Sequence, residues 1–161
     1  MRHGFWFAAI TSLTLALAQG SALASHYAVG DVPTLISAAD AEKLKKGGVN
    51  STEDMLSKAA TAKDRKALAK ASGLSAASIM NIAKRCDLLR VKGIGPEMVL
   101  LLEAAGVKTA ADLAKKDPAA LTTATDAANK SKKITDKPPT EPQFKDWIDQ
   151  AKALPAAVEG K

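Results

Sequence analysis

The stretch that most constrains the fold of this chain reads LLRVKGIGPEMVLLLEAAG, from Leu88 to Gly106. Two apolar runs flank the short break Gly93-Ile94-Gly95, and Pro96 follows at a position where helices commonly begin. Glycine permits the positive φ values and close backbone contacts of a tight turn, while Ile94 can fill the space between two helices. The stretch therefore predicts two helices joined by a hairpin.

The rest of the chain is also typical of short helices. Aromatic residues make up only 4% of the 161 residues, alanine is abundant, and apolar and polar residues do not alternate over a useful length. Capping residues, glycines and prolines separate helical patterns at 37–48, 51–60, 61–73, 75–89, 96–106, 109–116, 117–131 and 143–154. We expect an all-α domain with no sheet.

An internal repeat becomes visible when two segments of the chain are aligned at an offset of 58 residues. The matched pairs are Leu44 and Leu102, Gly48 and Gly106, Val49 and Val107, Ser51 and Thr109, and Asp54 and Asp112. So short a repeat can arise by chance in alanine-rich helices, but matches of distinct chemical roles favour duplication. The first copy has Leu35-Ile36-Ser37 where the second has Gly93-Ile94-Gly95, so its hairpin is degenerate.

The segment VKGIGPEMVLLLEAAG resembles the helix-hairpin-helix motif of many DNA ligases, nucleases, polymerases and exported DNA-uptake receptors. From Val32 to Pro155 the chain resembles an uncharacterised tandem helix-hairpin-helix family, domain-of-unknown-function family 4332. The segments DLLRVKGIG, LEAAGV and the late Trp147-Ile148 carry this resemblance. The chain departs from the family at the first hairpin and at Cys86, where a small residue is usual. The resemblance implies a fold without an established activity.

The first 24 residues have the pattern of a secretory signal peptide. Arg2 precedes an apolar stretch, and Ala22 and Ala24 provide the small residues of a cleavage site. The alternative is an uncleaved membrane anchor, although about 14 apolar residues are short against the about 20 that cross a membrane. We expect export to the periplasm or outside the cell, with 25–31 flexible, a domain at 32–155 and a frayed tail at 156–161.

The sequence offers little for catalysis. Cys86 is the single cysteine, and its helical spacing with Ile79, Ile82 and Leu89 favours a buried core position over a reactive thiol. His26 is the one histidine after the signal segment, and the carboxylates are scattered. We therefore expect no enzyme, metal, cofactor or small-molecule substrate.

The charge pattern favours an anionic partner. The chain has a formal net charge of +6, and residues 58–92 hold nine basic residues against two acidic ones, a local excess of +7. Lys63, Lys66 and Lys70 share one helical face, and they are either a phosphate-binding stripe or an ordinary solvated surface.

The leading expectation for function is contact with double-stranded DNA without sequence preference. Lys92, Gly93, Ile94 and Gly95 would bind a backbone phosphate with the N–H groups at the start of the following helix. The resemblance to helix-hairpin-helix DNA-binding proteins implies the same phosphate contact for this chain.

Two features oppose this reading. Glu97 lies in the first turn of that helix and would repel phosphate, and Met98 to Leu102 is apolar on every side. A helix of this kind is either central in the core or half covered by another protein. The alternative function is therefore an envelope protein-interaction or scaffold module that uses Met98 to Leu102.

The signal pattern makes the first testable prediction. The exported protein should begin at Ser25, because Ala22 and Ala24 fit the small side-chain pockets of a signal peptidase. Intact-mass spectrometry of the exported protein measures this directly. An exported form that retains Met1 would show that the segment is an anchor.

Overall fold

The computed structural model describes residues 26–160, and the predicted signal segment at 1–24 lies outside this part of the chain. The described residues form eight helices and no β-strand, which confirms the predicted all-α class. The helices are α1 (Ala38–Lys46), α2 (Thr52–Lys58), α3 (Ala62–Ser72), α4 (Ala76–Leu88), α5 (Pro96–Ala104), α6 (Ala110–Leu113), α7 (Pro118–Lys132) and α8 (Glu141–Ala153).

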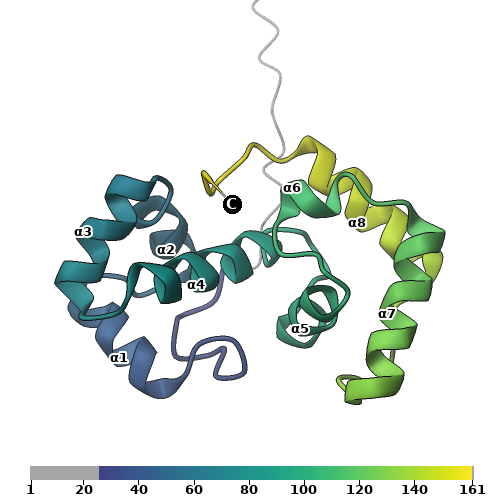
Figure 1. Ribbon diagram of the computed structural model, residues 1–161, viewed down its shortest axis with the longest axis horizontal. Coiled ribbons are helices and arrows are strands. Elements are labelled where there is room, and N and C mark those ends of the chain that lie inside the picture. The colour runs from purple at the N-terminus through teal and green to yellow at the C-terminus, as the bar shows by residue number, and fades with distance from the viewer. Residues whose placement is uncertain (1–25, 161) are drawn as a thin grey trace, which may run out of the picture.

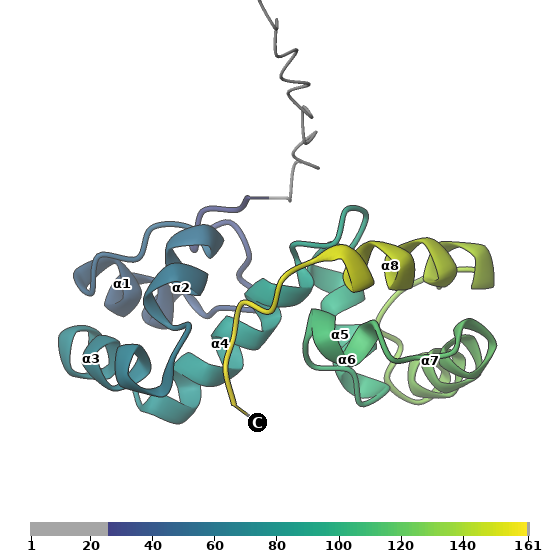
Figure 2. The ribbon, with the colours of Figure 1, turned by 90° about the horizontal axis from the view of Figure 1, so that it is seen from above.

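Helix α4 is the central element of the molecule. Its 13 residues extend over about 20 Å at the usual rise of 1.5 Å per residue. Helices α1, α2 and α3 lie at one end of α4, and α5, α6, α7 and α8 lie at the other (Figure 1). Figure 2 shows the same two groups with α4 passing between them. We call them the N-terminal and C-terminal halves.

Most of the helices begin at a residue whose side chain accepts a hydrogen bond from the backbone N–H three positions later. These residues are Ser37, Ser51, Thr61, Ser75, Thr109 and Asp117. Such caps satisfy N–H groups that have no partner within the helix, which explains why the predicted starts agree with the structure.

The core runs through both halves. Helix α8 contributes an inner face on which Phe144 and Trp147 meet edge to face, with ring centroids 5.5 Å apart. Cys86 is 1% exposed on α4, as its helical spacing predicted. Burial raises the pKa of its thiol to about 12, with a smaller contribution from Asp87, so the thiol stays protonated and unreactive at neutral pH.

The segment before α1, which the sequence predicts to be flexible at 25–31, makes backbone hydrogen bonds to residues 50–52. The N–H of Val29 donates to the carbonyl of Asn50 at 2.9 Å, and the N–H of Thr52 donates to Tyr27 at 2.9 Å. Ala28 and Ser51 form an isolated antiparallel bridge. Val29 is fully buried, so apolar burial and backbone pairing together hold the segment.

The segment after α8, which the sequence predicts to be a frayed tail at 156–161, makes hydrogen bonds to the N-terminal half in its described part. We call residues 155–160 the strap. It returns along α4 to the N-terminal half, as the yellow end of the ribbon shows in Figure 2. There the N–H of Glu159 donates to the carbonyl of Ala60 at 2.8 Å, and the buried Arg65 donates to the carbonyl of Glu159 at 2.8 Å.

The buried thiol leads to a stability prediction. Cys86→Ser should lower the free energy of unfolding by about 1–3 kcal/mol, because it places a hydroxyl in an apolar part of the core. Urea denaturation followed by circular dichroism measures the change. Met80→Ser on the same helix is the matched control and should cost less, since Met80 is only partly buried. Equal stability of Cys86→Ser and the wild type would contradict the assignment.

Candidate nucleic-acid interface

The Gly-Ile-Gly turn, residues 91–95, connects α4 to α5. The N–H of Val91 donates to the carbonyl of Leu88 at 3.1 Å, and the N–H of Ile94 donates to Val91 at 3.1 Å. These two bonds reverse the chain within a few residues. Ile94 is 1% exposed, so its side chain packs in the core between the elements that the turn joins.

The two glycines of this turn have different structural roles. Gly93 has φ +95°, and a Cβ atom there would lie 2.8 Å from Nε1 of Trp147. Both facts require glycine at position 93. Gly95 has φ −95° and ψ 179°, an extended conformation open to any residue, and a Cβ atom there would meet nothing within 4 Å. The expectation of positive φ at both glycines is therefore correct for Gly93 and wrong for Gly95.

Gly95 matters instead because it leaves the start of α5 uncapped. No described side chain accepts a hydrogen bond from the first turn of α5. At the matching position of the first copy, the hydroxyl of Ser37 accepts from the N–H of Asp40 at 3.1 Å and caps α1. The two copies therefore differ in whether their helix N–H groups are available to an external acceptor.

Elsewhere the matched positions of the repeat share their local geometry. Gly48 and Gly106 have φ values of +76° and +81°. The valine that follows each glycine is fully buried, and its N–H donates at 2.9 Å to the carbonyl five residues earlier in both copies. Divergence between the copies is thus concentrated at the turn, where Leu35-Ile36-Ser37 corresponds to Gly93-Ile94-Gly95.

Helix α8 supports the Gly-Ile-Gly turn from one side. The side-chain oxygen Oε1 of Gln150 accepts from the N–H of Lys92 at 2.9 Å, and its Nε2 donates to the carbonyl of Lys92 at 3.3 Å. Nε2 also donates to Asp146 at 2.8 Å, which sets the orientation of the amide. Sequence reasoning missed Gln150, because its partner lies 58 residues away and no local pattern marks it.

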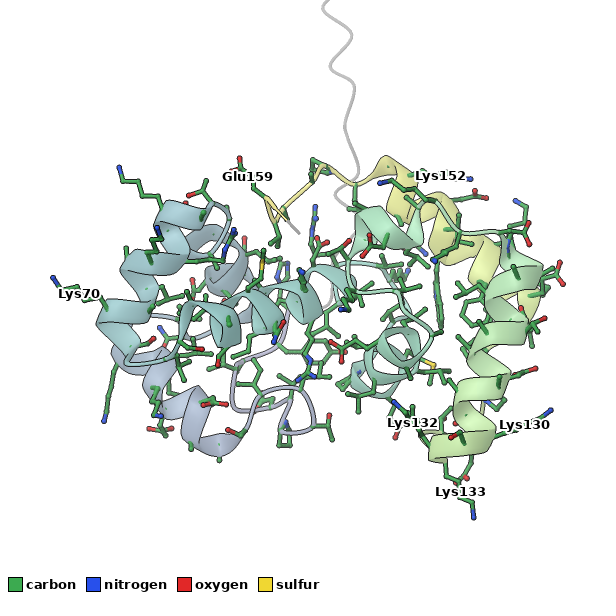
Figure 3. The ribbon with its side chains drawn as sticks, viewed as in Figure 1. Lys70, Lys130, Lys132, Lys133, Lys152 and Glu159 are labelled. Atoms are coloured by element: carbon green, nitrogen blue, oxygen red, sulfur yellow. The ribbon has the colours of Figure 1, made fainter. Side chains whose placement is uncertain are left out.

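The structure does not bring the predicted basic residues together. Lys92 is exposed at the turn, which packs beside α8 in the C-terminal half. Lys63, Lys66 and Lys70 are exposed on α3 in the N-terminal half, at the other end of α4 (Figure 1). Figure 3 labels Lys70 at that outer edge. One helical face carries the stripe, as predicted, but this face is not continuous with the turn.

Residues 58–92 have a formal charge excess of +7, but not all of this positive charge lies free at the surface. Arg65 is 6% exposed and donates to the carbonyl of Ala59 at 2.9 Å. Arg85 pairs with Glu103 at 2.9 Å, and Arg90 pairs with Asp87 at 2.7 Å. All three arginines are engaged in hydrogen bonds or ion pairs within the protein. The exposed positive charge of this region therefore belongs to lysines.

The apolar run of α5 lies in the core. Val99, Leu101 and Leu102 are buried, while Met98 and Leu100 are partly buried against the same core. The sequence allowed this helix to be either central in the core or half covered by another protein, and the structure places it in the core. Its surface retains little apolar area for a protein partner.

Within residues 26–160, no group of three His, Cys, Asp or Glu side chains is arranged to hold a metal ion. None of the helices in this part of the chain combines the length and the apolar character needed to cross a membrane.

Residues 34–154 match the family model described as Domain of unknown function (DUF4332). The chain belongs to this family. The match confirms the family that the sequence resembled, and it covers all eight helices from α1 to α8. No curated protein and no solved structure matches the chain.

The difference between the two glycines can be measured. Gly93→Ala should lower the free energy of unfolding by about 1–3 kcal/mol, because it combines an unfavourable φ with a clash against Trp147. Gly95→Ala is the matched control and should change stability by less than about 1 kcal/mol, since its backbone and surroundings accept a methyl group. Chemical denaturation of both variants tests this. Equal losses would contradict the described turn.

Proposed function

We propose that this chain is an exported, non-catalytic module that contacts the phosphate backbone of double-stranded DNA without reading its sequence. The contact is made by Lys92, Gly93, Ile94 and Gly95, within a tandem helix-hairpin-helix arrangement whose first hairpin has lost this role. No cofactor takes part.

The uncapped start of α5 is the observation that carries the proposal. Helix N-termini concentrate free N–H groups and a partial positive charge, which together favour an anion such as phosphate. Gly95 brings no side chain to this point, so a phosphate oxygen can approach the backbone closely. In the first copy the hydroxyl of Ser37 already occupies the equivalent place.

The proposed contact is independent of DNA sequence, because phosphate groups are the same at every base pair. Lys92 is exposed beside the turn and adds one cation. The α3 lysines lie in the other half of the molecule, so they attract the polyanion through their long-range field rather than at the same phosphate. We therefore expect weak binding, with a dissociation constant of about 10⁻⁴–10⁻⁶ M at physiological salt.

The alternative, a protein-interaction or scaffold module, has less support. It needs an apolar surface on α5, and only Met98 and Leu100 in the run Met98 to Leu102 retain partial exposure. A specific protein interface needs about 600–1,000 Å² from each partner, more than two partly covered side chains provide.

A salt titration tests the proposal. The protein should bind duplexes of unrelated sequence equally, and log affinity should fall with log salt at a slope of about −0.9 per phosphate neutralised. Lys92→Ala should make this slope shallower by about one unit and weaken all duplexes alike. Fluorescence anisotropy at low salt measures both, with Lys43→Ala, an exposed lysine of α1, as the matched control.

Glu97→Lys provides the complementary variant. It should tighten binding, because it removes a carboxylate from the first turn of α5 and places a cation there. Glu53→Lys makes the same charge change in the first turn of α2 and should have a smaller effect. Absence of binding to any duplex, or binding indifferent to Lys92 and Glu97, would favour the protein-partner alternative.

A further inference from the structure

A second basic site lies beneath the strap, and it shares no residue with the Gly-Ile-Gly turn. A cavity of about 380 Å³, open to solvent on one side, is lined by residues of α4, by the segment 108–115 around α6, and by the strap. Three lysines line it: Lys84 from α4, and Lys108 and Lys115 from the α6 segment. Two separate parts of the chain, α4 and the α6 segment, therefore place three ammonium groups around one space.

These lysines have no acidic partner in the described part of the chain. No carboxylate of residues 26–160 lies within 4.0 Å of the amines of Lys84, Lys108 or Lys115, although ion pairs of this kind occur elsewhere on the surface, as between Lys145 and Asp149 at 2.9 Å. Three like charges around one cavity repel each other. An anion placed between them would relieve this repulsion.

Two carboxylates also line the cavity, but both are engaged by other groups. Asp87 accepts from Arg90 at 2.7 Å and from the N–H of Ala110 at 2.9 Å. Asp112 accepts from the N–H of Lys108 at 3.3 Å. Three lysines and two carboxylates line the cavity, a formal excess of +1, and the charge of Asp87 is already paired with Arg90.

The strap is a fixed wall of this cavity. At one end Arg90 donates to the carbonyl of Pro155 at 2.9 Å, and at the other Arg65 donates to the carbonyl of Glu159 at 2.8 Å. The N–H of Glu159 donates in turn to Ala60 at 2.8 Å. Figure 3 labels Glu159 where the strap meets the N-terminal half. Because both anchors hold the backbone, residues 156–158 keep a defined position over the cavity.

We propose that this cavity binds a compact anion with two or more negative charges, and that the bound anion and the strap stabilise each other. Its volume is in the range of small-molecule sites and too small for a duplex. Lysine amines on flexible stems suit a compact ligand rich in oxygen acceptors. Organic phosphates and polycarboxylates both have this chemistry.

Isothermal titration calorimetry of the whole protein at low salt tests the proposal, with inorganic pyrophosphate and citrate as separate probes. Pyrophosphate binding alone identifies a phosphate ligand, citrate binding alone identifies a carboxylate ligand, and binding of both identifies a general anion site. Lys84→Gln and Lys115→Gln should each weaken binding by about tenfold, as expected for the loss of a charge-assisted contact. Lys130→Gln is the matched control: this lysine lies at the far end of α7 (Figure 3) and should leave binding unchanged.

Hydrogen exchange of the Glu159 amide supplies a second readout. The probe that binds should slow this exchange, since the strap forms a wall of the occupied cavity. Lys92→Ala should leave the anion affinity unchanged, which separates this site from the proposed DNA contact. Absence of binding by both probes, an equal loss with Lys130→Gln, or unchanged exchange at Glu159 would overturn the proposal.

Discussion

The C-terminal half depends on the ion pair and hydrogen bonds made by the buried carboxylate of Asp87. It is 3% exposed at the end of α4, and an ionised group removed from water needs partners. One of its oxygens accepts from Arg90 and the other from the N–H of Ala110, at the first residue of α6. Arg90 continues to the carbonyl of Pro155, so a single carboxylate joins α4, α6 and the start of the strap. The Gly-Ile-Gly turn begins just beyond this junction.

Arg85 makes a similar connection between the two copies of the repeat. Its guanidinium pairs with Glu103 of α5 and donates to the carbonyl of Leu35, in the first, degenerate turn, at 2.7 Å. The planar guanidinium group suits such a contact because it donates in several fixed directions. Arginines therefore hold the halves together from inside, and lysines carry the exposed charge. This division of roles explains why both proposed anion sites rest on lysines.

The two copies of the repeat differ at one turn residue that affects the helix N-terminus but not the packing of the turn. Both retain a buried isoleucine at the turn, Ile36 and Ile94, each 1% exposed. They differ at the next residue, where Ser37 caps its helix and Gly95 does not. The packing function of the turn thus survives in both copies, while a free helix N-terminus is present only in the second. Helix α8 also constrains the second turn: Gln150 accepts a hydrogen bond from the N–H of Lys92, and Trp147 leaves no space for a side chain at Gly93.

The sequence by itself determined the helices, most of their caps, the family and the buried positions of Ile94 and Cys86. These follow from hydrogen bonds within four residues and from apolar spacing along one helix, which the chain carries locally. Only the tertiary structure decided that Gly93 must avoid Trp147, that Val29 and the strap are bound, and that the α3 lysines lie away from Lys92. Each of these depends on contacts between residues far apart in the chain, and no local pattern records such contacts.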